Sequence, residues 1–167
     1  NVVIPPFENA VKYNVATFMN AFNDVDGIPA TANHFLLRDL LKGNWNYNGV
    51  VVSDWGSIGE MVIHGFSEDL KQSALQAITA GSDIDMESQA YINHLEQLVQ
   101  ENPAIENFID DAVKRVLLLK FKLGLFDDPY KYSNEDRESK IVNSDANLKL
   151  AEESALKSIV LLKNEKQ

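Results

Sequence analysis

Three short runs of apolar and β-branched residues recur along the chain, with helix-like stretches between them. The runs span residues 15–23, 49–54 and 83–86. Their composition predicts strands, of which the third is the shortest. The centres of the runs, at Phe18, Val51 and Ile84, are 33 residues apart each time. Such a regular spacing indicates a repeated structural unit.

Leucines and alanines at helical spacing predict helices over residues 33–42 and 68–80. Each ends at a glycine, Gly43 or Gly81, which suits the C-terminus of a helix. A strand, a helix and a second strand form the parallel βαβ unit. Eight such units in a (β/α)8 barrel occupy about 250 residues, or about 31 each, close to the observed spacing. Three units cannot close a barrel, and an open doubly wound sheet has much the same spacing.

After the third run the pattern changes to helices and then to a polar stretch. Helices are expected over residues 91–100 and 103–123, the second ending at Gly124. We expect three parts: the later part of a barrel at 1–126, an interdomain linker at 127–144 and the start of a second α/β domain at 145–167. The last part combines an amphipathic helix over 145–156 with a strand over 158–163. A strand there implies that a second domain continues beyond this segment.

Composition narrows the class of partner. The chain has 167 residues, 45% hydrophobic and 24% charged, as in ordinary globular proteins. Its net charge of -10 disfavours nucleic acid and anionic membranes as partners. No apolar run approaches the roughly 20 residues of a membrane helix. There is no cysteine, and His34, His64 and His94 lack neighbours at metal-ligand spacing.

The segment GVVVSDWGSI, residues 49–58, places a carboxylate and an indole where a buried strand ends. In parallel α/β structures, functional groups gather at the carboxyl ends of strands. Asp54 is therefore either a catalytic or binding carboxylate, or a cap of the following turn. Trp55 adds a flat apolar surface that the C–H face of a sugar ring can cover, or that a neighbouring helix can cover instead.

The residues VVSDWGSI resemble the nucleophile segment of glycoside hydrolase family 3. Four further segments match this family in the same order: FMNAFNDVDGIPATANHFLLRDLLK, AGSDIDM, DDAVKRVLLLKFKLGLFDDPY and ESALKSIVLLKNE. The resemblance implies an α/β fold comprising about strands 6 to 8 of a TIM (β/α)8 barrel. A linker would then lead into a second domain, an α/β sandwich.

The resemblance also implies roles for individual residues. Asp54 would be the catalytic nucleophile at the end of strand seven, with Trp55 as the aromatic wall beside the cleaved bond. Met19 and Phe22 would line the site from strand six, and Met86 from the segment after strand eight. Phe22 stands where the family commonly has tyrosine, so that a packing role remains but the hydroxyl is absent.

The function implied is that of a retaining, exo-acting β-glycosidase, β-glucosidase-like, that hydrolyses terminal β-linked sugars of oligosaccharides or glycosides. The acid/base glutamate would lie outside this chain, together with the upstream barrel strands, so the segment alone is expected to be inactive. No metal or other cofactor is implied, and a periplasmic or secreted location is favoured. The alternatives are a β-xylosidase, a non-catalytic carbohydrate-binding relative, and a barrel lyase or aldolase, which would need a lysine or metal ligands at the strand ends.

Overall fold

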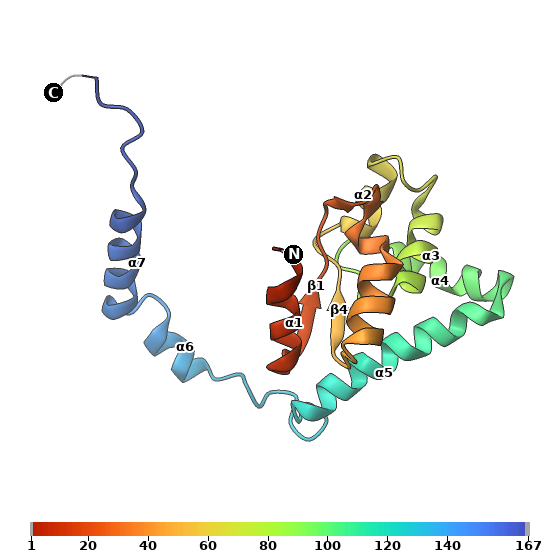
Figure 1. The fold of residues 1–167 in the computed structure, drawn as a ribbon. Coiled ribbons are helices and arrows are strands. Elements are labelled where there is room, and N and C mark those ends of the chain that lie inside the picture. Colours follow the sequence, from red (N-terminus) through yellow and green to blue (C-terminus); the bar gives the residue numbers. More distant parts are fainter. Residues whose placement is uncertain (1, 166–167) are drawn as a thin grey trace. The chain divides into compact units, whose positions relative to one another are not determined.

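The computed structural model describes residues 2–165, and these divide into two compact units on either side of the boundary between Phe126 and Asp127. The first unit is an α/β assembly that contains all the described strands (Figure 1). Within residues 2–165, no helix has both the length and the apolar character that crossing a bilayer requires.

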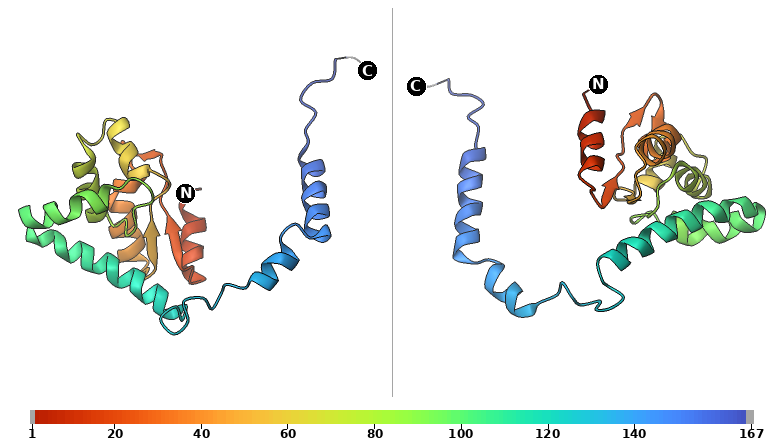
Figure 2. Two further views of the ribbon diagram at one scale, coloured as in Figure 1. Left: turned by 180° about the vertical axis from the view of Figure 1, so that it is seen from behind. Right: turned by 60° about the horizontal axis from the view of Figure 1, so that its bottom comes forward.

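Two parallel strands form the centre of the first unit. They are β1 (Thr17–Met19) and β4 (Val50–Val52), which pair residue by residue in that register. Ile84 extends the pairing through a parallel bridge to Val52. The predicted parallel neighbours are thus confirmed, but the strands are shorter than expected and the third is a single bridge. Figures 1 and 2 show β1 and β4 side by side, with α1 (Ile4–Lys12) next to β1.

The first run is shorter than predicted because the chain turns into a hairpin after β1. Strands β2 (Asp24–Val25) and β3 (Ile28–Pro29) pair antiparallel. Asp26 and Gly27 connect them, both with positive φ, which is the geometry of a tight two-residue turn. The Asp-Gly pair is a recognised hairpin signal, but the flanking strands are too short for an alternating pattern to be visible.

Helices surround the parallel strands. Besides α1, they are η1 (Ala30–Ala32), η2 (Phe35–Asn44), α2 (Ser57–Ile63), α3 (Leu70–Ala80), α4 (Ala90–Glu101), η3 (Pro103–Ile105) and α5 (Glu106–Lys122). The helices predicted from periodicity are present as η2, α3, α4 and η3 with α5. The helices α1 and α2 were not predicted.

Helix η2 begins and ends about two residues later than predicted, and it has π-helical turns. The Asn33 side chain accepts a hydrogen bond from the Leu36 amide (3.0 Å), which caps the start. At the end, the Trp45 amide bonds the carbonyl of Leu40, five residues earlier (3.0 Å). Gly43 therefore lies within the helix rather than after it, and the prediction of its terminating role was wrong.

Helix α3 follows its sequence signals closely. The Asp69 carboxylate accepts from the Gln72 amide (2.8 Å) at the N-terminus. Gly81 ends the helix with φ of +112°, and a Cβ there would lie 3.2 Å from Nε of Arg38. Both the backbone conformation and the close packing therefore favour glycine at this position.

The core of the unit has two parts. The larger lies between α2, α3, α4 and α5 and consists of Ile58, Met61, Ala74, Ala77, Ile78, Ala90, Leu98, Ile105 and Ala112. The smaller lies between the strands and η2 and consists of Leu37, Leu41, Tyr47, Val51 and Ala80. In the smaller part the Phe18 ring contacts the rings of Phe7 (5.8 Å) and Tyr47 (4.9 Å between centroids). This contact attaches α1 to β1.

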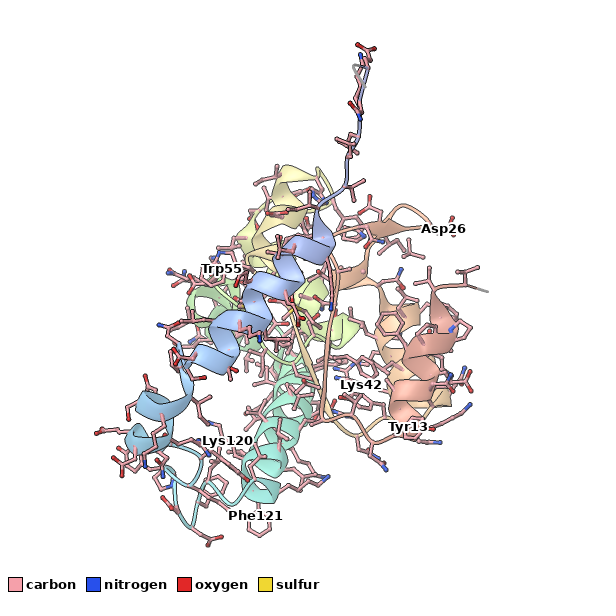
Figure 3. The ribbon with its side chains drawn as sticks, turned by 90° about the vertical axis from the view of Figure 1, so that its left-hand side faces the viewer. Tyr13, Asp26, Lys42, Trp55, Lys120 and Phe121 are labelled. Atoms are coloured by element: carbon pink, nitrogen blue, oxygen red, sulfur yellow. The ribbon has the colours of Figure 1, made fainter. Side chains whose placement is uncertain are left out.

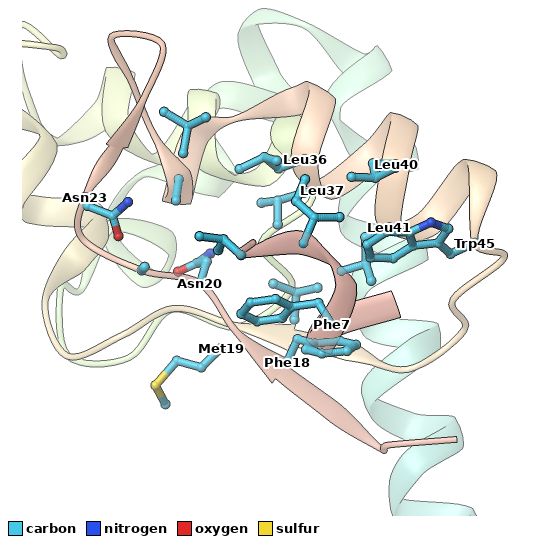
Figure 4. A pocket seen from close by; sticks show the side chains of 16 residues that line it. Phe7, Phe18, Met19, Asn20, Asn23, Leu36, Leu37, Leu40, Leu41 and Trp45 are labelled. Carbon is cyan, nitrogen blue, oxygen red and sulfur yellow. The ribbon is translucent and has the colours of Figure 1, made fainter. Parts of the chain in front are cut away.

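A pocket of about 350 Å³ lies where α1, β1 and η2 meet (Figure 4). Leucines of η2 and the rings of Phe7, Phe18 and Trp45 line it. Asp54 is not among the lining residues. We therefore interpret this pocket as a gap in helix packing rather than as the candidate active site.

Charged side chains hold the N-terminal end of β4. Asp111 of α5 accepts from Arg38 of η2 (2.7 Å) and from Arg115 (3.0 Å). Arg115 also donates to the carbonyls of Tyr47 and Gly49 (3.0 and 3.2 Å), which immediately precede β4. Because these bonds fix where β4 begins, they tie both helices to the strand.

A second ion pair lies deeper in the unit. Lys42 Nζ is 2.5 Å from Asp83 Oδ1, and both side chains are almost fully buried. Asp83 Oδ2 accepts from the Val51 amide (2.8 Å). Burial lowers the pKa of Lys42 to about 8, against the opposing effect of the Asp83 charge. Asp83 therefore joins η2 to β4.

The second unit contains α6 (Glu135–Ile141) and α7 (Asp145–Ser158). Helix α7 matches the predicted helix. Helix α6 lies in the stretch that was interpreted as a linker because it lacks apolar periodicity. Its stability comes instead from the Asn134 cap, which accepts from the Arg137 amide (2.6 Å), and from acidic residues in its first turn.

The strand expected at residues 158–163 is also not formed. Ser158 ends α7, and residues 159–165 have no regular structure. A strand needs a hydrogen-bonding partner, and residues 127–165 contain no second strand. The β-branched composition of this stretch therefore cannot by itself form the predicted element.

One buried hydroxyl gives a stability prediction. Ser73 in α3 is fully buried, and its Oγ is the one buried side-chain nitrogen or oxygen within residues 2–165 that has no hydrogen-bond partner. Ser73→Ala should raise the free energy of unfolding by about 1 kcal/mol, because it removes an unpaired polar group and favours the helix. Ser82→Ala is the matched control, since Ser82 is equally buried but hydrogen-bonded on both sides. Denaturant unfolding should show opposite signs for the two variants; equal losses would contradict the prediction.

The buried lysine gives a pH prediction. Between about pH 8 and pH 10.5, the unfolded chain keeps a proton on Lys42 that the folded chain has released, so raising the pH stabilises the fold. The unfolding free energy of the wild type minus that of Lys42→Met should therefore become more positive from pH 7.5 to pH 10. In Asp83→Asn the rise in unfolding free energy with pH should begin at a lower pH, because the Asp83 charge raises the pKa of Lys42. A difference that shrinks with pH would mean that ion pairing outweighs burial.

Candidate active site

The site forms where the two strands and the Ile84 segment end side by side. The Asn20 amide, just after β1, donates to the Val52 carbonyl (3.1 Å). The Ser53 amide, just after β4, donates to the Ile84 carbonyl (2.9 Å). These bonds continue the parallel pairing beyond the strands, so that Asp54 emerges between the chain segments that carry Met19 and Met86.

The Asp54 carboxylate is half-buried. Its Oδ1 accepts a hydrogen bond from the Trp55 amide (2.7 Å), whereas Oδ2 accepts none within residues 2–165. Helix α2 follows directly, but its N-cap is Gly56 and no side chain caps it. The capping interpretation therefore accounts for one oxygen in a local turn and leaves the other available to a ligand.

Two large side chains border this carboxylate segment. The Trp55 side chain is 64% exposed and lies at the surface, whereas Lys42 lies in the interior (Figure 3). Met19 is 49% exposed and points away from the leucines of η2, on the opposite face of β1 from Phe18 (Figure 4). Alternation along the strand explains this, because Phe18 enters the core and Met19 faces the other way.

Met86 and Phe22, the other two residues predicted to line the site, are held in different ways. Met86 is half-buried, and its backbone bonds to the Asp54 segment on both sides: its amide to Ser53 Oγ (2.8 Å) and its carbonyl to the Gly56 amide (2.8 Å). Phe22 is half-buried in the loop before the hairpin. The hydrogen bonds that join the strand ends do not include Phe22.

A buried polar network lies beneath these loops. Asn20 Nδ2 donates to Ser82 Oγ (2.6 Å), whose hydroxyl donates to the Thr31 carbonyl (2.9 Å). Thr31 Oγ1 lies 3.1 Å from Ser57 Oγ and 3.3 Å from Asn20 Oδ1. The network joins the end of β1, η1 and the start of α2. Sequence reasoning missed it, because small polar residues at distant positions carry no periodic signal.

Other candidate residues have local roles. Asp85 accepts from the amides of Ser88 (3.2 Å) and Tyr91 (3.1 Å) and so fixes the loop before α4. His64 lies 3.9 Å from carboxylate oxygens of both Asp24 and Glu60. Among residues 2–165, no group of three or more histidine or acidic side chains is arranged to hold a metal ion.

The chain is similar to a known family of proteins. Residues 1–119 match the model of the glycosyl hydrolase family 3 N-terminal domain. The chain belongs to this family. The resemblance identified from the sequence is thus confirmed.

Named relatives cover almost the whole chain. A periplasmic β-glucosidase of Salmonella typhimurium is 35% identical over 168 residues, covering 98% of this chain and 22% of the relative. A putative β-xylosidase of Formosa agariphila is 38% identical, with the same coverage. The crystal structure of a β-glucosidase from Listeria innocua superimposes with a TM-score of 0.81 at 40% identity, covering 98% of this chain and 22% of that structure. The Listeria enzyme has also been crystallised with glucose and, as a mutant, with laminaribiose.

The chain spans about a fifth of the length of these relatives. The comparisons therefore assign the family and leave the activity of the whole protein to be inferred.

Proposed function

We propose that this chain supplies the nucleophile of a retaining, exo-acting β-glycosidase. The observation that carries the proposal is Asp54 itself, which stands at the carboxyl end of the central strand. One of its oxygens has no hydrogen-bond partner among residues 2–165, and the exposed Trp55 lies beside it. In this proposal β1, β4 and the Ile84 segment are strands six to eight of a (β/α)8 barrel, whose active sites lie at that end.

The chemistry follows from the position of the carboxylate. Asp54 Oδ2 attacks the anomeric carbon as the glycosidic C–O bond breaks, and an acid elsewhere protonates the departing oxygen. Water then attacks the same carbon, gives up a proton to the residue that acted as acid, and restores the free carboxylate. That second residue is a glutamate outside this chain. Neither step requires a metal or other cofactor.

Relatives support a β-linked sugar as substrate. Those named above are β-glucosidases and β-xylosidases, and a family 3 exo-β-xylosidase has been crystallised with a xylobiose aziridine activity-based probe (TM-score 0.74, 30% identity). We propose a terminal β-linked glucoside first and a xyloside second, with Trp55, Met19, Phe22 and Met86 lining the site. A periplasmic or secreted location fits the Salmonella relative.

The partner of this chain is the rest of the same polypeptide. Helix α5 and the segment after it expose an apolar stripe that includes Val113, Leu117, Phe121 and Phe126. Upstream barrel strands and helices would cover this surface. A second candidate function, carbohydrate binding without catalysis, would use the same side chains but predicts no covalent intermediate.

The decisive test is removal of the nucleophile. Asp54→Ala in the full-length protein should lower kcat on an aryl β-glucoside and an aryl β-xyloside by at least about 10⁴-fold, because the variant lacks the carboxylate that forms the covalent intermediate. Asp136→Ala, at an exposed aspartate in α6, should leave kcat unchanged. Labelling the wild type with 2-deoxy-2-fluoro glycosides, followed by peptide mapping, should place the adduct on Asp54. An adduct on another residue, or near-normal turnover by Asp54→Ala, would refute the assignment.

The indole gives a separate prediction about binding. Trp55→Ala should lower kcat/KM for β-glycosides by about 10- to 100-fold, because the sugar or aglycone loses an apolar surface. Trp55→Phe should lose less. Since the side chain is 64% exposed, the melting temperature should change little in either variant. A large drop in melting temperature would show instead that Trp55 packs against another part of the protein.

A further inference from the structure

We propose that the Ser53 hydroxyl positions the Asp54 carboxylate for attack by locking the Asp54 peptide to the loop that carries Met86. The inference rests on the proposed function, and it assigns Ser53 a positioning role rather than a catalytic one. Ser53 is fully buried directly after β4, so its hydroxyl faces the protein interior.

The hydroxyl uses both of its hydrogen-bonding capacities. Ser53 Oγ accepts from the Met86 amide (2.8 Å) and donates its single hydrogen to the Asp54 carbonyl (3.0 Å). It therefore connects the segment that carries the proposed nucleophile to the segment that follows Ile84. The Gly56 amide completes a second connection by donating to the Met86 carbonyl (2.8 Å).

The planarity of the peptide bond transmits this connection to the carboxylate. The Asp54 carbonyl and the Trp55 N–H belong to the same peptide unit, so they rotate together. Ser53 Oγ donates to the carbonyl at one edge of this plane, and the Trp55 N–H at the opposite edge donates to Asp54 Oδ1 (2.7 Å). Fixing the carbonyl therefore fixes the direction from which the amide holds Oδ1, and with it the direction in which Oδ2 points.

The other bond to this carbonyl is weaker and local. The Ser57 amide also donates to the Asp54 carbonyl (3.2 Å), but it belongs to the start of α2 on the same loop. Without the Ser53 hydroxyl, that bond would keep the turn formed while the peptide plane lost its connection to the Met86 segment. A loss of orientation with the fold retained is the expected result.

The test isolates the attacking carboxylate from the acid. A 2,4-dinitrophenyl 2-deoxy-2-fluoro-β-glucoside, or the xyloside analogue if that labels the wild type, needs no protonation of its leaving group. Asp54 forms a bond to the anomeric carbon, and dinitrophenolate departs with the electron pair of the broken C–O bond. The inactivation rate constant of the full-length protein thus reports the positioning of Asp54, and the inactivator dissociation constant reports binding.

Ser53→Ala should lower the inactivation rate constant by about 10- to 100-fold, the loss expected from a misplacement of about 1 Å. The dissociation constant should stay within about threefold, because Trp55 and Met19 are unchanged. Ser53→Thr keeps the hydroxyl and should recover the rate to within about threefold. Ser53→Cys, close to serine in size but a weaker hydrogen-bonding group, should lie between them and replaces Ser53→Ala if that variant does not fold.

Ser82→Ala is the matched control, since Ser82 is equally buried and its hydroxyl also donates one bond and accepts one. It should lower the melting temperature and leave the inactivation rate within about threefold. The inference is overturned if Ser53→Ala reacts as fast as wild type, or if Ser82→Ala slows equally for the same loss of stability. Failure of the proposed function looks different, because the wild type itself would then not be labelled at Asp54.

Discussion

Parallel pairing of segments 33 residues apart is the constraint on which the site depends. The register aligns Met19 with Val52, and a parallel bridge joins Val52 to Ile84. The carboxyl ends of the three chain segments therefore lie side by side. No regular ladder extends beyond a few residues, so the pairing is continued by single amide bonds from Asn20 and Ser53. Of the side chains proposed to contact substrate, all but Phe22 lie on or just after one of these three ends.

The two ends of the strands are held by different kinds of interaction. At the start of β4, arginines and a buried lysine pair with Asp111 and Asp83, and these pairs join helices to backbone. At the carboxyl end, neutral hydroxyls and an amide make the connections. Fixed charges close to a nucleophilic carboxylate would alter its ionisation, whereas neutral hydrogen bonds can orient it without adding charge.

The sequence was informative where a signal is local or periodic. The 33-residue spacing predicted the parallel neighbours, and Gly81 marked the end of α3 correctly. Asp54 and Trp55 could be proposed as site residues because a predicted strand indicates where the residues after it emerge. The pairing of Lys42 with Asp83 was not visible, since it depends on register between distant elements. The strand expected at the end of the chain failed for a related reason: composition favours a strand, but only a partner strand forms one.

Ser53 shows how a residue can be missed even inside a recognised motif. Its position after a buried strand is typical of a turn residue, and serine commonly bonds nearby backbone groups. What distinguishes it is the second bond, to the Met86 amide, because that bond joins two strand ends rather than closing one turn. Only the three-dimensional arrangement shows that the hydroxyl which bonds the neighbouring Asp54 carbonyl also bonds the amide of Met86, 33 residues away. A carboxylate that must reach one carbon from one direction requires such a connection, because a single loop leaves its peptide plane free to rotate.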